Sequence, residues 1–181
     1  MEKRWNLLEI DETSVQKLSK ELGISSILAK ILYNRGIRTV EEGRAYLFDT
    51  VEDLHDPFLM KGMEKAVHAI CKALVEKKKI VIYGDYDVDG ITSTSLLYSI
   101  LCDLGGKPQY YIPERMSEGY GLNREAVQSL IGDKTDILIT VDCGISSYDI
   151  VDEYKDDLTI IITDHHEPPQ AIPPAFAVLN P

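Results

Sequence analysis

Five short apolar runs, separated by segments with helix signals, occupy the chain from residue 80 onward. The runs cover residues 80–83, 110–112, 137–141, 158–162 and 176–179, and the helical segments cover 92–104, 123–131 and 147–154. Continuous apolar runs of this length are typical of strands that are buried on both faces of a parallel sheet. The alternation therefore predicts a doubly wound α/β domain with a mostly parallel sheet.

The residues before this region predict short helices instead. Apolar residues recur at helical spacing within 15–22 and within 27–32. Thr39 and Glu42 match the spacing of a capping box, which satisfies two free amides at the start of a helix. Residues 49–57 break the pattern and are interpreted as a linker.

The domain organisation follows from these patterns. A continuous apolar stripe at 63–75 predicts a core helix that precedes the first strand. We expect a small helical amino-terminal region at residues 1–56 and an α/β domain at 57–181. Because the strand pattern stops at Pro181, we expect this domain to be truncated at its carboxyl-terminal end.

The charge balance limits the possible partners. The 181 residues carry a formal net charge of -11, with 30 acidic and 19 basic residues. An acidic surface repels a polyanion, so any contact with nucleic acid should be local or mediated by a metal. The three cysteines lack the spacing of a metal or redox pair, which indicates reduced thiols in a cytoplasmic protein. No apolar run approaches the roughly 20 residues of a membrane span, and we expect no membrane partner.

Acidic and imidazole side chains follow three of the predicted strands. Asp85, Asp87 and Asp89 follow the first strand, Asp142 follows the third, and Asp164, His165 and His166 follow the fourth. The carboxyl ends of parallel strands meet along one edge of a sheet, so these clusters should converge there. Clustered carboxylates repel one another, and bound divalent cations would offset that repulsion. Oxygen and imidazole donors suit Mn²⁺ or Mg²⁺.

A pair of such ions predicts hydrolysis of a phosphodiester. Two cations about 4 Å apart can activate a water molecule and stabilise the leaving oxygen. We expect Thr92 and Ser93 to open the next helix beside the metals, where free amides favour a bound phosphate. Both are therefore candidate substrate-binding residues.

Two other classes of protein explain the acidic turn less well. Asp-x-Asp-x-Asp-Gly also begins an EF-hand loop, but Leu96 stands where a bidentate glutamate is required, and an apolar strand precedes the loop. Haloacid-dehalogenase phosphatases also place Asp-x-Asp after a strand, but they leave the paired histidines unexplained. Taken alone, the turn could be a solvated loop, and His165 and His166 could be surface residues. Three clusters at three strand ends argue against coincidence.

The amino-acid sequences of these motifs are specific. They read Tyr-Gly-Asp-Tyr-Asp-Val-Asp-Gly at 83–90, Tyr-Ile-Pro-Glu-Arg at 111–115, Glu-Gly-Tyr-Gly-Leu at 118–122, Val-Asp-Cys-Gly-Ile at 141–145 and Thr-Asp-His-His-Glu at 163–167. In these residues the chain resembles the DHH phosphoesterase superfamily, and within it the RecJ-type exonucleases. The resemblance extends to the helical lead-in and so covers nearly the whole chain.

The resemblance implies a single-strand-specific 5′ to 3′ DNA exonuclease of DNA repair and recombination, with Mn²⁺ or Mg²⁺ at a two-metal site. It implies that Asp87 and Asp89 bind different metals and that Asp142 bridges them. It further implies that His165 is a metal ligand and that His166 assists at the scissile phosphate.

Supporting roles are also implied. Asp85 is expected to be an additional ligand, and Asp164 is expected to orient the histidines. The loop that contains Arg115 and Tyr120 offers an aromatic ring on which a base can stack, which favours a nucleic-acid substrate. We therefore expect Arg115 and Tyr120 to bind substrate.

Other parts of the family pattern would lie beyond Pro181. They are a further metal-ligating aspartate and a second domain with a glycine-rich substrate motif. We therefore expect this chain to be an amino-terminal piece of a longer enzyme, with weak or no hydrolysis of its own. Short RNA and cyclic dinucleotides stay open as substrates, because related members act on them. A non-catalytic metal-binding module is the other alternative, and protein partners are not predicted.

Overall fold

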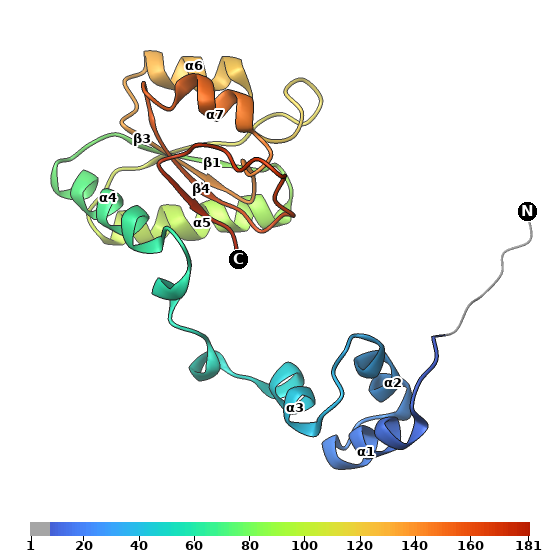
Figure 1. The fold of residues 1–181 in the computed structure, drawn as a ribbon. Coiled ribbons are helices and arrows are strands. Elements are labelled where there is room, and N and C mark those ends of the chain that lie inside the picture. The colour runs from blue at the N-terminus through green and yellow to red at the C-terminus, as the bar shows by residue number, and fades with distance from the viewer. Residues whose placement is uncertain (1–7) are drawn as a thin grey trace, which may run out of the picture. The chain divides into compact units, whose positions relative to one another are not determined.

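The computed structural model describes residues 8–181, which form two compact units (Figure 1). The first unit ends at His55, and the second is Asp56–Pro181. The predicted boundary lies beside this division, while residues 1–7 of the predicted helical region lie outside the described residues. That the first unit is an independent domain stays a prediction.

The first unit contains three helices, α1 (Glu12–Leu22), α2 (Ser26–Asn34) and α3 (Val40–Phe48). Each begins where a side chain caps it: Asp11, Ser25 and Thr39 accept hydrogen bonds from amides of the first turn. Thr39 and Glu42 form the predicted capping box. The helices enclose a small apolar core of Val15, Leu18, Leu22, Ala29 and Leu32.

The second unit alternates helices with strands. The short 3-10 helix η1 (Val51–Asp53) still belongs to the first unit. In the second unit, the 3-10 helix η2 (Pro57–Leu59) is followed by α4 (Met63–Val75), β1 (Ile80–Gly84), α5 (Val88–Asp103), β2 (Gln109–Tyr111), α6 (Arg124–Gly132), β3 (Ile137–Val141), α7 (Tyr148–Tyr154), β4 (Thr159–Thr163) and β5 (Ala177–Leu179). The strands pair in parallel in the order β2-β1-β3-β4-β5. The predicted α/β fold with a parallel sheet is confirmed.

Helices cover both faces of this sheet (Figure 1): α4 and α5 lie on one face, and α6 and α7 lie on the other. Ile80 and Ile82 of β1 pack in the core beneath α4 and α5, whereas Val81 and Tyr83 pack beneath α6 and α7. Because successive side chains point to opposite faces, a strand covered on both sides is apolar at every position. Within residues 8–181, no helix has both the length and the apolar composition that crossing a membrane requires.

Helix α5 begins earlier than the sequence predicted. It starts at Val88 rather than Thr92, because Asp87 caps it. The Asp87 carboxylate accepts hydrogen bonds from the amides of Asp89 and Gly90, both at 3.0 Å. The helix therefore begins inside the acidic motif itself.

Candidate metal centre

The register of the sheet aligns the ends of three strands. Gly84 of β1 pairs with Val141 of β3, which in turn pairs with Thr163 of β4. The residue that follows each of these strands is an aspartate, namely Asp85, Asp142 and Asp164. The structure thus brings the three acidic clusters together at the carboxyl edge, where folds of this kind bind ligands.

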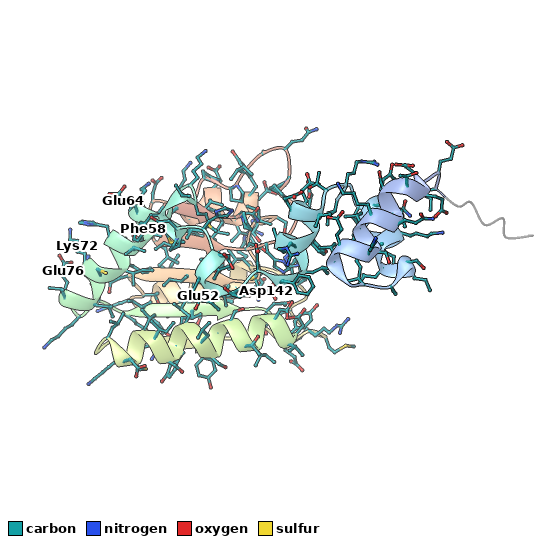
Figure 2. All side chains as sticks on the ribbon, turned by 90° about the horizontal axis from the view of Figure 1, so that it is seen from below. Glu52, Phe58, Glu64, Lys72, Glu76 and Asp142 are labelled. Atoms are coloured by element: carbon teal, nitrogen blue, oxygen red, sulfur yellow. The ribbon has the colours of Figure 1, made fainter. Side chains whose placement is uncertain are left out.

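Two groups of possible metal ligands share Asp142, which Figure 2 labels. Asp85, Asp87 and Asp142 form one group, and Asp142, His165 and His166 form the other. Within each group the ligand atoms lie within 4.8 Å of one another. A carboxylate has two oxygens and can serve both groups, which is what a two-metal site needs.

The buried carboxylate of Asp85 tests whether a cation fits here. Asp85 is 4% exposed, and its buried Oδ1 atom has no hydrogen-bond partner among the described residues. Burial of an ionised oxygen without a partner is strongly unfavourable. The neighbouring Asp87 and Asp142 add negative charge instead of relieving it. A divalent cation would supply the missing partner, so these residues fit a metal ion.

Asp142 has an uncommon backbone conformation and an unfavourable charge environment. Its φ of 62° lies in the left-handed region, which aspartate tolerates better than most residues other than glycine. In the turn that follows, the Thr140 hydroxyl donates to the Cys143 carbonyl at 2.7 Å. Burial, followed by the charge of Asp87, raises the pKa of Asp142. A positive charge would stabilise this carboxylate.

Asp164 contacts the backbone of both histidines and the ring of His166, and its predicted role in orienting them stays a prediction. Its buried carboxylate accepts hydrogen bonds from the amides of Ile145 at 3.0 Å, His165 at 2.8 Å and His166 at 3.1 Å. Burial opposes ionisation, but these hydrogen bonds outweigh it and lower the pKa of Asp164. One carboxylate oxygen lies 2.7 Å from Nδ1 of His166, and this contact raises the pKa of His166. Nε2 of His165 lies 3.0 Å from Oδ1 of Asp142.

Asp89 and Arg115 are among the predicted site residues that lie outside both ligand groups. Asp89 is exposed in the first turn of α5, where it lines an open pocket together with Asp142 and His165. The guanidinium of Arg115 lies over the ring of Tyr86, 5.3 Å from its centroid. Metal binding by Asp89 and substrate binding by Arg115 stay predictions.

The prediction that Thr92 and Ser93 open a helix is wrong. Because Asp87 caps α5 earlier, both residues lie one turn inside the helix. The Thr92 hydroxyl donates to the Val88 carbonyl at 2.7 Å, and the Ser93 hydroxyl donates to the Asp89 carbonyl at 2.6 Å. Both still line the open pocket at the carboxyl edge, so substrate binding by their side chains stays a prediction.

Sequence reasoning missed one set of contacts. It assigned base stacking to Tyr120. It did not predict that the Tyr120 hydroxyl lies 3.1 Å from Nδ1 of His166. It gave no role to Glu118, whose carboxylate accepts hydrogen bonds from Tyr111 and Asn123. The signal in the sequence was the pair of glycines that flank Tyr120, which indicates a sharp turn but not what the turn touches.

Known proteins resemble the chain in sequence. The single-stranded-DNA-specific exonuclease RecJ of Bacillus subtilis is 40% identical over 98% of this chain and 23% of its own length. RecJ of Escherichia coli is 35% identical over 96% of this chain and 29% of its own length. The chain thus spans about a quarter of the length of the relatives it matches.

Solved structures and a family description agree with these matches. The structure of an exonuclease RecJ bound to manganese matches 71% of this chain and 33% of its own, with a TM-score of 0.65 and 36% identity. RecJ in complex with Mn²⁺ from Thermus thermophilus matches 97% of this chain and 24% of its own, with a TM-score of 0.67 and 27% identity. The description "DHH family, N-terminal domain" matches residues 79–181, which include all five strands and both ligand groups. The chain therefore belongs to the DHH family.

Proposed function

We propose that this chain is the metal-binding part of an exonuclease that hydrolyses single-stranded DNA from 5′ to 3′ with Mn²⁺ or Mg²⁺. The observation that carries the proposal is the position of Asp142, which both ligand groups share. Relatives named as single-stranded-DNA-specific exonucleases support the substrate, and similar structures bound to manganese support the ion.

The ligand groups suggest how two ions would be held. Asp85 and Asp87 would hold one ion together with Asp142, and His165 would hold the other together with Asp142. Asp89, on the first turn of α5, would complete the set. When bound, such ions lower the pKa of a water molecule and stabilise the leaving oxygen of a phosphodiester.

The chain's own residues contribute orientation and control of a proton. Asp87 is already fixed by the amides that it caps, so little freedom remains for it to lose when it binds a ligand. Asp164 holds the proton of His166 on Nδ1, which makes Nε2 the nitrogen that can exchange a proton with the substrate. Because its pKa is raised, His166 also keeps a positive charge to higher pH and can pair with a phosphate oxygen.

A polyanionic substrate must approach a chain whose net charge is -11. Bound cations would offset the charge at the carboxyl edge, and the exposed Arg115 adds a guanidinium near it. Tyr120 is 45% exposed and can stack on a base. This chain spans about a quarter of the length of its relatives. We infer that further basic surface belongs to the rest of the enzyme.

The proposal is tested with the full-length enzyme on a labelled, 5′-phosphorylated single strand. We expect mononucleotides to be released from the 5′ end when Mn²⁺ is present and none when it is chelated. A duplex of the same sequence, a matching RNA strand and a cyclic dinucleotide serve as controls. Release from the 3′ end, or equal rates on RNA, would contradict the substrate assignment.

The same assay separates the chain from the whole enzyme. We expect residues 1–181 alone to fold, to bind metal weakly and to hydrolyse the strand poorly or not at all. Positioning of a substrate can contribute several orders of magnitude to a rate, and this chain matches only about a quarter of the length of its relatives. Comparable rates for the chain and the full-length enzyme would show that residues 1–181 contain the complete site.

A further inference from the structure

The connection between β2 and α6, residues 112–122, reaches the candidate metal centre through one side chain. We name this connection the Tyr120 loop. The Tyr120 hydroxyl lies 3.1 Å from Nδ1 of His166 and 3.4 Å from the carbonyl oxygen of Asp142. The two rings meet edge to face, with centroids 5.7 Å apart and an interplanar angle of 74°. Tyr120 therefore contacts the same ring nitrogen of His166 that Asp164 contacts at 2.7 Å.

Glu118 ties the Tyr120 loop to the rest of the fold. Its carboxylate accepts hydrogen bonds from Nδ2 of Asn123 at 2.6 Å, from the backbone amide of Glu114 at 2.8 Å and from the hydroxyl of Tyr111. Asn123 is the N-cap of α6, and Tyr111 ends β2. The Glu114 amide, followed by the Tyr111 hydroxyl, lowers the pKa of Glu118, so the carboxylate stays an ionised acceptor near neutral pH.

Tyr83 holds the other end of the turn. Its hydroxyl donates to the carbonyl of Gly121 at 3.1 Å, and its ring stacks on Tyr111 with centroids 5.1 Å apart. Gly119 and Gly121 have φ angles of 79° and 81°, so the chain turns sharply on both sides of Tyr120. Glycines permit many conformations, and side-chain contacts at each end must select this one.

We propose that Glu118 is a positioning residue, which fixes the Tyr120 hydroxyl at Nδ1 of His166 and thereby fixes the imidazole ring. The inference rests on the proposed function, since His166 matters here for its part in hydrolysis. The single Nδ1 proton is donated to Asp164 at 2.7 Å, and the Tyr120 hydroxyl can share it as a second acceptor while it donates its own proton to the Asp142 carbonyl. Together with Asp164, this arrangement holds the proton on Nδ1 and keeps Nε2 for the substrate.

A purely structural role for Glu118 predicts something different. Under that alternative, Glu118→Gln lowers the free energy of unfolding and leaves kcat unchanged well below the unfolding temperature. Tyr120→Phe removes only the hydroxyl and keeps the ring for base stacking. If Glu118 acts through this hydroxyl, the two substitutions remove the same contact, and their effects do not multiply.

The kinetic test uses the full-length enzyme with Mn²⁺ and the 5′-phosphorylated strand. We expect Glu118→Gln and Tyr120→Phe each to lower kcat by about 10-fold or more, the scale of partners that orient active groups, with little change in KM. The double variant should be no slower than either single variant. Glu114→Gln is the matched control, because Glu114 lies in the same loop and its carboxylate, among the described residues, accepts a hydrogen bond from the Ser117 hydroxyl alone, at 2.8 Å. Effects that multiply, or an unchanged kcat in Glu118→Gln, would overturn the proposal.

A second readout does not depend on activity. The nitrogen chemical shifts of the His166 ring, measured by NMR on the metal-free enzyme, report which nitrogen carries the proton. Because Asp164 holds the proton on Nδ1 in every variant, we expect the Nδ1 form throughout, with a shifted Nδ1 signal in Glu118→Gln and Tyr120→Phe but not in Glu114→Gln. Unchanged His166 signals in Glu118→Gln would overturn the proposal. If the wild-type enzyme fails to hydrolyse single-stranded DNA, the proposed function fails, while these signals still decide the positioning role.

Discussion

At the amino-terminal edge of the sheet, acidic and basic groups are paired, whereas at the carboxyl edge acidic groups face one another. Figure 2 shows Glu76 of α4 at the opposite end of the unit from Asp142. Glu76 pairs with Lys78 at 3.3 Å, and the Lys79 amide donates to Asp136 at 2.8 Å. At the carboxyl edge, by contrast, Asp142 belongs to a group of three carboxylates.

Overall acidity does not explain this difference, because both edges belong to the same chain of net charge -11. The acids at the amino-terminal edge are exposed and have partners nearby, so water and counter-charges stabilise them. Asp85 and Asp142 are buried at 4% and 7% exposure, where like charges repel more strongly. The carboxyl edge is therefore built for a positive ligand. Four predictions test this difference between the two edges.

Asp142→Ala should have the largest effect. Loss of the shared carboxylate should reduce hydrolysis by the full-length enzyme by about 100-fold or more, since even outer partners of metal ligands contribute up to that scale. Asp136→Ala, at the amino-terminal edge, should leave kcat unchanged. Steady-state kinetics measures both variants, and circular dichroism shows whether each is folded. Near-normal turnover by folded Asp142→Ala would contradict the two-metal assignment.

The two edges should also differ in metal affinity. We expect tighter binding of Mn²⁺ than of Ca²⁺, because the His165 nitrogen is a donor that Ca²⁺ uses poorly. His165→Ala should weaken Mn²⁺ binding by about 10-fold or more and leave Ca²⁺ binding nearly unchanged. The exposed His68 of α4 provides the control, since its substitution by alanine should change neither value. Calorimetric titration decides, and equal or tighter Ca²⁺ binding would favour an EF-hand-like site.

Stability without metal should change in opposite directions at the two edges. Asp85→Asn removes charge from a buried oxygen that has no hydrogen-bond partner among the described residues, and should raise the free energy of unfolding by about 1 kcal/mol. Asp136→Asn weakens the hydrogen bond from the Lys79 amide and should lower the free energy of unfolding by about 1 kcal/mol. Urea denaturation in the presence of a chelator measures both. The same sign for both variants would remove the contrast between the edges.

The smallest effect is expected for an exposed ion pair at the amino-terminal edge. Lys155 lies 2.5 Å from Asp152, with side-chain exposures of 40% and 47%. Lys155→Ala should leave the free energy of unfolding nearly unchanged, because water screens such a pair. Mn²⁺ affinity should stay the same, as titration of the same sample can show. A larger loss of stability would mean that the paired charges contribute more to the fold than this comparison assigns to them.

The sequence predicted the sheet well because its strands are buried on both faces and are therefore apolar at every position. It also placed the acidic residues at one edge, since the direction of parallel strands alone determines where they end. The start of α5 was not predictable in this way. Gly90 favours a loop by its own preference, yet it lies in the helix that Asp87 caps, and the position requires glycine because a Cβ there would come within 2.4 Å of the Asp85 carbonyl oxygen.

The contacts of Glu118 and Tyr120 could not be predicted from the sequence either, and the physical reason is related. Periodicity describes helices and strands, and the Tyr120 loop is neither. Its path depends on hydrogen bonds to residues far along the chain, such as the one from Tyr83 to Gly121. Only the folded structure shows which partners these side chains meet.

The alignment of Gly84, Val141 and Thr163 makes the centre sensitive to residue counts within strands. Deletion of one residue from β3 would shift Asp142 by about 3.3 Å along the strand and turn its side chain to the opposite face. The connections that enter the strands at the amino-terminal edge contain none of these ligand residues and are under no such restriction, because surface loops tolerate gained or lost residues. Insertions can therefore accumulate in the connections at the amino-terminal edge, while a single deletion inside β3 removes Asp142 from both ligand groups.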